Sequence, residues 1–138
     1  MRTLKTVLIG LGLTLVVNGA WAELVHISTS SSGNKTYIYT ETIRSSNHLI
    51  GARGKQAWLE TVYGKKNFFH KKKPVHKSKA LEVANCTDET TGIKSVVLYY
   101  DNKGNVIDSW TNSYVEMTPP APNTVGSDIF RAICFNEY

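Results

Sequence analysis

Hydrophobic and polar residues alternate in short runs along most of the chain, which is the pattern of strands in an antiparallel sheet. The run at residues 36–41 is typical, since Tyr37 and Tyr39 fall on one face and Ile38 on the other. Residues that favour turns separate the runs, as in the segments 30–35 and 101–104. The pattern predicts six strands, at residues 24–28, 36–41, 56–63, 77–86, 93–100 and 105–110.

Near the C-terminus the apolar spacing changes to that of a helix. The proline-rich segment 117–122 can continue neither a ladder nor a helix, so we expect an extended connector there. Asn123 or Thr124 can cap the helix that follows, and Asp128 near its start complements the helix dipole. Its apolar stripe consists of Val125, Ile129, Phe130, Ile133 and Cys134.

The first 22 residues have the organisation of a secretory signal peptide. Arg2 and Lys5 precede a short apolar stretch, and the small residues Ala20 and Ala22 form the site at which a signal peptidase would cut, before Glu23. A membrane anchor is the alternative, but the apolar stretch is too short to span about 30 Å of hydrocarbon. We therefore expect residues 1–22 to be a signal peptide and residues 23–138 to be one exported domain.

The chain has two cysteines, Cys86 and Cys134. In an oxidising compartment such a pair is expected to form one disulfide, although two buried free thiols are an alternative. A zinc site is disfavoured because the cysteines lack the close ligand pairs that such sites use. In the strand at 77–86, Ala80, Ala84 and Cys86 share a face of small side chains, to which a disulfide would tie the C-terminal helix.

Charge is concentrated in one segment. The whole chain carries a formal charge of +5, and residues 23–138 carry fourteen basic and eleven acidic side chains, a net charge of +3. Seven of those basic residues are lysines between positions 65 and 79, where there is no carboxylate. The remainder of the domain therefore has a net charge of −4.

This lysine-rich segment is the candidate binding site. Its composition suits a mobile loop, and Pro74 prevents a helix from forming across it. Concentrated positive charge attracts polyanions over about 8 Å at physiological salt, so acidic glycosaminoglycans, anionic lipids, nucleic acid or acidic protein segments are candidate partners. The alternative is a solvated loop without a ligand. The candidate residues are Lys65, Lys66, Phe68, Phe69, Lys71, Lys72, Lys73, Lys77 and Lys79.

No motif in the sequence indicates catalysis or a cofactor. The four histidines have neither a partner at i+4 nor a cysteine or carboxylate at ligand spacing. No serine has the surroundings of a nucleophile elbow, and the glycines at 51 and 54 lack the pattern of a phosphate-binding loop. We therefore expect no enzymatic activity, no metal and no cofactor.

Several short segments together resemble the bacterial surface-adhesin protein E family. They follow the family's order and spacing over almost the whole exported domain, and the most specific is the closing stretch at 124–134 with its cysteine. The others are Tyr37-Ile38-Tyr39, Thr42-Ile43-Arg44, Ala57-Trp58, Tyr63, Ala84-Asn85-Cys86, Tyr99-Tyr100 and Gly104-Asn105-Val106.

The resemblance implies an α+β fold of about six antiparallel strands in a twisted sheet, with a C-terminal helix packed on it and tethered by a disulfide. It also implies a Gram-negative cell-envelope adhesin that recognises host extracellular-matrix or serum proteins of the laminin and vitronectin type, with a homodimer possible. No lipoprotein cysteine follows Ala22. The expected location is therefore the periplasm, the outer cell surface or the medium, and a periplasmic structural or inhibitor-type module with bacterial partners is the alternative function.

Overall fold

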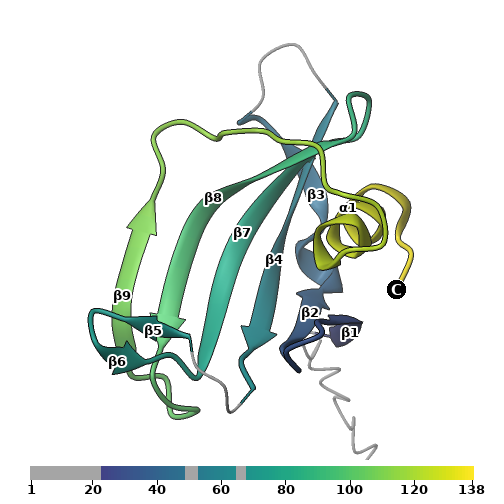
Figure 1. Cartoon of the computed structure of the whole chain (residues 1–138). Coiled ribbons are helices and arrows are strands. Elements are labelled where there is room, and N and C mark those ends of the chain that lie inside the picture. The colour runs from purple at the N-terminus through teal and green to yellow at the C-terminus, as the bar shows by residue number, and fades with distance from the viewer. Residues whose placement is uncertain (1–22, 49–52, 65–67) are drawn as a thin grey trace, which may run out of the picture.

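Seven strands form one antiparallel sheet in the computed structural model, which describes residues 23–48, 53–64 and 68–138. The strands lie in the order β1, β2, β4, β7, β8, β9, and β3 pairs with β4 (Figure 1). Their bounds are β1 Leu24–Thr29, β2 Lys35–Tyr39, β3 Arg44–Ser46, β4 Gly54–Val62, β7 Lys77–Asn85, β8 Thr90–Tyr99 and β9 Val106–Thr111. The sheet is strongly twisted, as the figure shows.

The six expected strands are all present, with ends shifted by at most three residues. The strand β3 was not among those that the sequence pattern predicts, because the polar residues Ser45 and Ser46 show no alternation of polar and apolar side chains. β2 pairs with only part of β4, from Leu59 to Val62, and β3 pairs with the remainder of the same edge, from Gly54 to Gln56. The short 3-10 helix η1 (Thr40–Thr42) joins β2 to β3. A polar segment becomes a strand here because it completes the backbone hydrogen bonding of β4.

The predicted helix is α1 (Val125–Phe135), and Thr124 is its N-cap. The Oγ1 atom of Thr124 accepts a hydrogen bond from the backbone N of Ser127 at 3.3 Å, and the Ser127 Oγ accepts one from the backbone N of Thr124 at 3.3 Å. These two bonds form a capping box. The helix ends at Asn136, which has a left-handed conformation with φ of 53°.

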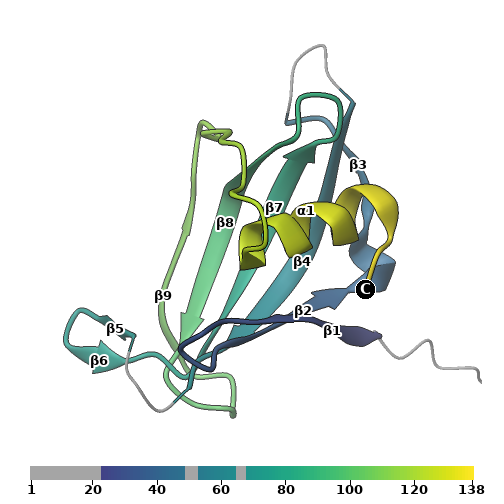
Figure 2. The same ribbon diagram turned by 45° about the vertical axis from the view of Figure 1, so that its right-hand side comes forward.

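α1 packs across one face of the sheet, against β1, β4, β7 and β8 (Figure 2). Phe130, Ile133 and Cys134 enter the main core there, against Ala57 and Ala84 of the sheet. The expected disulfide between Cys86 and Cys134 is present, with Cα atoms 5.7 Å apart. The small side chains on β7 allow this approach, so the prediction of a close helix contact on that face is confirmed.

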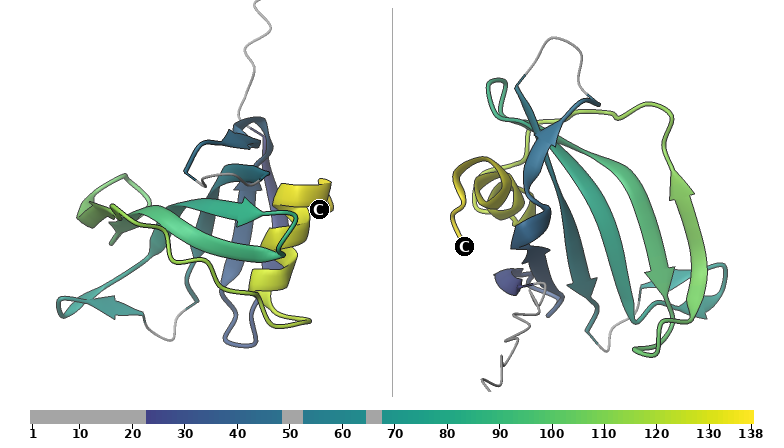
Figure 3. Two further views of the ribbon diagram at one scale, coloured as in Figure 1. Left: turned by 90° about the horizontal axis from the view of Figure 1, so that it is seen from above. Right: turned by 180° about the vertical axis from the view of Figure 1, so that it is seen from behind.

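The lysine-rich segment is not simply a loop. Within its described residues, β5 (Phe69–His70) pairs with β6 (Lys73–Pro74) to form a short hairpin. Val75 then packs with Val96 and Leu98 of β8 in a second core cluster. Figure 3 shows the hairpin and α1 on the same side of the sheet. α1 does not cover the opposite face, which is turned toward the viewer in the right panel.

No helix within the described ranges is long and apolar enough to cross a membrane.

Candidate ligand-binding surface

The structure separates the nine candidate binding residues into three groups. Lys65 and Lys66 lie outside the described residues. Phe68, Phe69, Lys71, Lys72 and Lys73 belong to the hairpin or directly precede it. Lys77 and Lys79 lie at the start of β7 and point to the sheet face that α1 leaves open, since Lys79 pairs with Glu60 and alternates with the inward-facing Ala80.

The turn of the hairpin has an unusual backbone. Lys71 and Lys72, its two central residues, have φ angles of 50° and 64°. Positive φ at both central positions is the geometry of a type I′ turn, which usually contains Asn and Gly. Each lysine in this region costs about 1 kcal/mol relative to ordinary backbone conformations. Such strain persists where surrounding contacts impose it, and it occurs preferentially at functional sites.

Contacts with β9 hold the hairpin in place. The His70 Nε2 lies 2.8 Å from the Asp108 Oδ2, and the Lys71 Nζ lies 2.9 Å from the same oxygen. The His70 ring also stacks on Trp110, with ring centroids 5.9 Å apart. Hydrogen bonds from Lys71 and His70 lower the pKa of Asp108 to about 2, so this carboxylate is charged at any physiological pH.

These contacts leave part of the basic hairpin available. Lys71 is paired with Asp108, but Lys72 and Lys73 are exposed and form no ion pair with any described residue. Phe69 is 55 % exposed beside them, and Phe68 packs on Tyr63 at a centroid distance of 5.1 Å. The hairpin thus presents two free ammonium groups and one exposed aromatic ring from a fixed position.

Lys77 and Lys79 have a different environment. Their Nζ atoms lie 3.6 and 4.0 Å from carboxylate oxygens of Glu60, which is nearly buried. The Tyr39 hydroxyl donates to the same carboxylate at 2.6 Å, and burial, followed by this bond, raises the pKa of Tyr39. Both lysines also lie over the Tyr99 ring, at 5.4 and 5.9 Å from its centroid. Their charges are therefore largely satisfied within the protein.

A shallow cavity of about 310 Å³ adjoins this network on the open face. Aromatic side chains from three strands dominate its walls, and one lysine reaches its rim. The lining residues are Tyr39, Thr42, Trp58, Lys79, Val97 and Tyr99.

The acidic and aromatic partners of the lysines were not predicted from the sequence. Asp108 is 38 residues from His70, and Glu60 lies on β4, so neither carboxylate has a local signal that links it to the basic segment. Pairing of β4 with β7 and of β8 with β9 brings them together. A prediction of strand order and register would have been needed to find them.

The fold and this surface define a small, disulfide-tethered sheet-and-helix domain whose exposed features are those of a binding protein. The family model for surface-adhesin protein E matches residues 21–135, and the chain belongs to that family. No curated protein sequence matches the chain.

Solved structures of protein E from Haemophilus influenzae have the same fold. Crystal form II of that protein is 14 % identical, with a TM-score of 0.55 over 82 % of this chain and 87 % of the other. A second structure of the protein, also 14 % identical, has a TM-score of 0.53 over 82 % and 84 %. Its selenomethionine form is 16 % identical, with a TM-score of 0.51 over 80 % and 86 %. The predicted family and fold are thereby confirmed.

Proposed function

We propose that this chain is an exported, non-enzymatic adhesin that binds host extracellular-matrix or serum proteins, of the laminin and vitronectin type, through acidic segments or attached polyanions. Membership of the surface-adhesin protein E family supports the adhesin class. The proposed binding site rests on the basic hairpin, in which Lys72 and Lys73 are exposed. Contacts with Asp108 hold its strained turn in place.

The electrostatics of the domain support a polyanionic target. Outside residues 65–79 the exported domain is acidic, so repulsion would keep a polyanion away from most of its surface. Among the described residues, the hairpin is an exposed basic segment on this acidic domain, and Phe69 adds apolar contact area beside its charges. Lys77 and Lys79 contribute less to binding in this proposal, because Glu60 already neutralises them.

Charge reversal of the hairpin tests this function. The variant Lys72→Glu/Lys73→Glu is expected to weaken binding to heparin, laminin or vitronectin about tenfold at low salt, since each exposed ion pair contributes about 0.2–1 kcal/mol and each new glutamate adds repulsion. Surface plasmon resonance at two salt concentrations measures the change.

The matched control is Lys35→Glu/Arg53→Glu, which changes the net charge equally at two exposed positions, one on β2 and one directly before β4. This control is expected to lose much less affinity. Equal losses in both double variants would show that only net charge matters, and unchanged binding by the hairpin variant would exclude the hairpin as the site.

Fractionation separates this proposal from a periplasmic structural or inhibitor-type module. We propose that residues 1–22 direct export and that cleavage follows Ala22. If the protein is an adhesin, added protease should digest it on intact cells, while a periplasmic marker stays protected. Complete protection of both proteins would favour the periplasmic alternative.

A further inference from the structure

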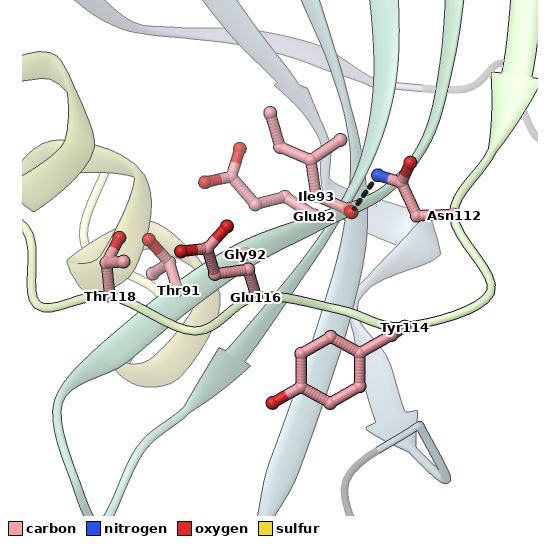
Figure 4. A pocket seen from close by; sticks show the side chains of 8 residues that line it. All are labelled: Glu82, Thr91, Gly92, Ile93, Asn112, Tyr114, Glu116 and Thr118. Atoms are coloured by element: carbon pink, nitrogen blue, oxygen red, sulfur yellow. Dashed lines mark hydrogen bonds between the residues drawn. The ribbon is translucent and has the colours of Figure 1, made fainter.

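A cavity of about 620 Å³ lies on the same sheet face as α1, beneath the segment that connects β9 to the helix. Figure 4 shows Glu82 of β7 and Glu116 of the connecting segment directing their carboxylates toward this space. Thr91 and Ile93 of β8 form its floor, and Asn112 and Tyr114 lie at the β9 end. The volume falls within the range typical of small-molecule sites.

The connecting segment is fixed against β8. Thr91 and Thr118 exchange two backbone hydrogen bonds of 2.9 Å, and the backbone N of Asn112 donates to the Lys94 carbonyl at 2.8 Å. Between these points, a Cβ atom at Gly92 would lie only 2.4 Å from the Glu116 carbonyl oxygen. Glycine therefore permits the close approach that places Glu116 near Glu82.

Glu82 is an anomaly in this location. It shares its face of β7 with Ala80 and Ala84, at the edge of the apolar core, and it forms no hydrogen bond or ion pair with any described residue. Burial raises its pKa to about 7. Glu82 is half-buried, and an unpartnered, desolvated carboxylate that lines a cavity is a candidate for ligand contact.

Two lysines near this face donate hydrogen bonds to backbone carbonyls and not to the cavity carboxylates. The Lys94 Nζ donates to the Asn112 carbonyl at 2.6 Å, and the Lys55 Nζ donates to the Cys134 carbonyl at the end of α1 at 3.4 Å. Glu116 adds a second negative charge to the cavity, and it is exposed. The cavity thus presents two carboxylates, and neither forms an ion pair with a described cation.

We propose that this cavity binds an organic cation, with an ammonium or guanidinium group held between the carboxylates of Glu82 and Glu116. Ile93 supplies an apolar wall for an alkyl chain, and the Tyr114 ring, 80 % exposed, can cover the cation. A divalent metal is a poorer fit, because Ca²⁺ requires six to eight oxygen ligands. No group of three His, Cys, Asp or Glu side chains that could hold a metal exists among the described residues. The cation can belong to a free amine or to a lysine or arginine side chain.

Titration with cadaverine, followed by NMR or calorimetry at pH 8, tests the site on the exported chain. Glu82→Gln is expected to weaken cadaverine binding at least about tenfold, as expected for loss of a charge-assisted bond. Glu116→Gln should weaken it less, because that carboxylate is exposed. Glu41→Gln, an exposed substitution on η1, serves as the matched control and should leave affinity unchanged.

Comparison of ligands identifies the source of the cation. The neutral analogue 1,5-pentanediol should not bind, and N-acetyl-lysine methylamide should bind if the cavity accepts a protein side chain. If cadaverine alone binds, the natural ligand is a free amine. Absence of binding by both ammonium compounds, equal binding by Glu82→Gln, or a response to Ca²⁺ alone would overturn the proposal.

The hairpin variant separates this site from the proposed adhesin function. Lys72→Glu/Lys73→Glu should retain cadaverine binding, because neither lysine lines the cavity. Failure of the polyanion experiment would therefore leave the cation site unaffected. Failure of the cadaverine titration would equally leave the proposed adhesin function unaffected.

Discussion

Removal of the Cys86–Cys134 disulfide is expected to lower the free energy of unfolding by about 4 kcal/mol, from the entropy of a closed loop with a sequence separation of 48 residues. The loss is large for a domain of this size, whose total stability is about 5–15 kcal/mol. α1 depends on this tether because its contacts with the sheet are concentrated around Cys134 and the adjoining Phe130 and Ile133. Denaturation by guanidinium of the variant Cys86→Ala/Cys134→Ala measures the effect.

Reduced wild-type protein provides the control for the alanine substitutions. It should unfold at nearly the same denaturant concentration as the double variant, since alanine and a buried thiol differ little in packing. If the oxidised, reduced and alanine proteins all unfold together, the disulfide contributes no stability and the core alone holds α1. A free-thiol assay on the native protein should detect reactive cysteine only after reduction.

The second large effect concerns the pH dependence of stability. Burial raises the pKa of Glu82 from 4.5 to about 7, so the folded state binds this proton more tightly than the unfolded state does. The stabilisation from the bound proton is fully present below pH 4.5 and is lost as pH rises through 7. At pH 8 the variant Glu82→Gln is therefore expected to be about 2–3 kcal/mol more stable than the wild type, and near pH 4 the two should be equal.

Urea denaturation at pH 4, 6 and 8 measures this difference. Glu116→Gln is the matched control, because Glu116 lines the same cavity from an exposed position and should change the pH dependence little. Parallel stability curves for the wild type and Glu82→Gln would contradict the assignment of a half-buried carboxylate with a raised pKa. Stability gained in this variant and binding lost in the cadaverine titration would together indicate that Glu82 contributes to ligand binding and destabilises the fold.

Local patterns predicted most of the fold. Alternation located the six main strands, and helical spacing with the Thr124 cap located α1. The disulfide was predictable because only one pairing of two cysteines exists. The turn at Lys71 and Lys72 was not predictable, because lysine is a poor turn residue and the left-handed backbone is imposed by contacts with β9.

The candidate binding residues were likewise predictable from the sequence only in part. The sequence by itself determined where positive charge is concentrated, since net charge depends only on composition. Tertiary structure decided which lysines are available: register between β4 and β7 places Lys79 beside Glu60, whereas Lys72 has no such partner among the described residues.

The sequence determined the strands, the helix, the disulfide and the basic segment because each depends on residue spacing or composition within a short stretch. Only the tertiary structure brought Glu82 and Glu116 to one cavity, since their approach depends on Gly92 and on the course of the segment after β9. It also left Glu82 without a partner in the part of the chain that the structure describes. Local patterns encode which elements form. The burial and pairing of a charge depend on residues that are distant in sequence and become neighbours only through strand order and register.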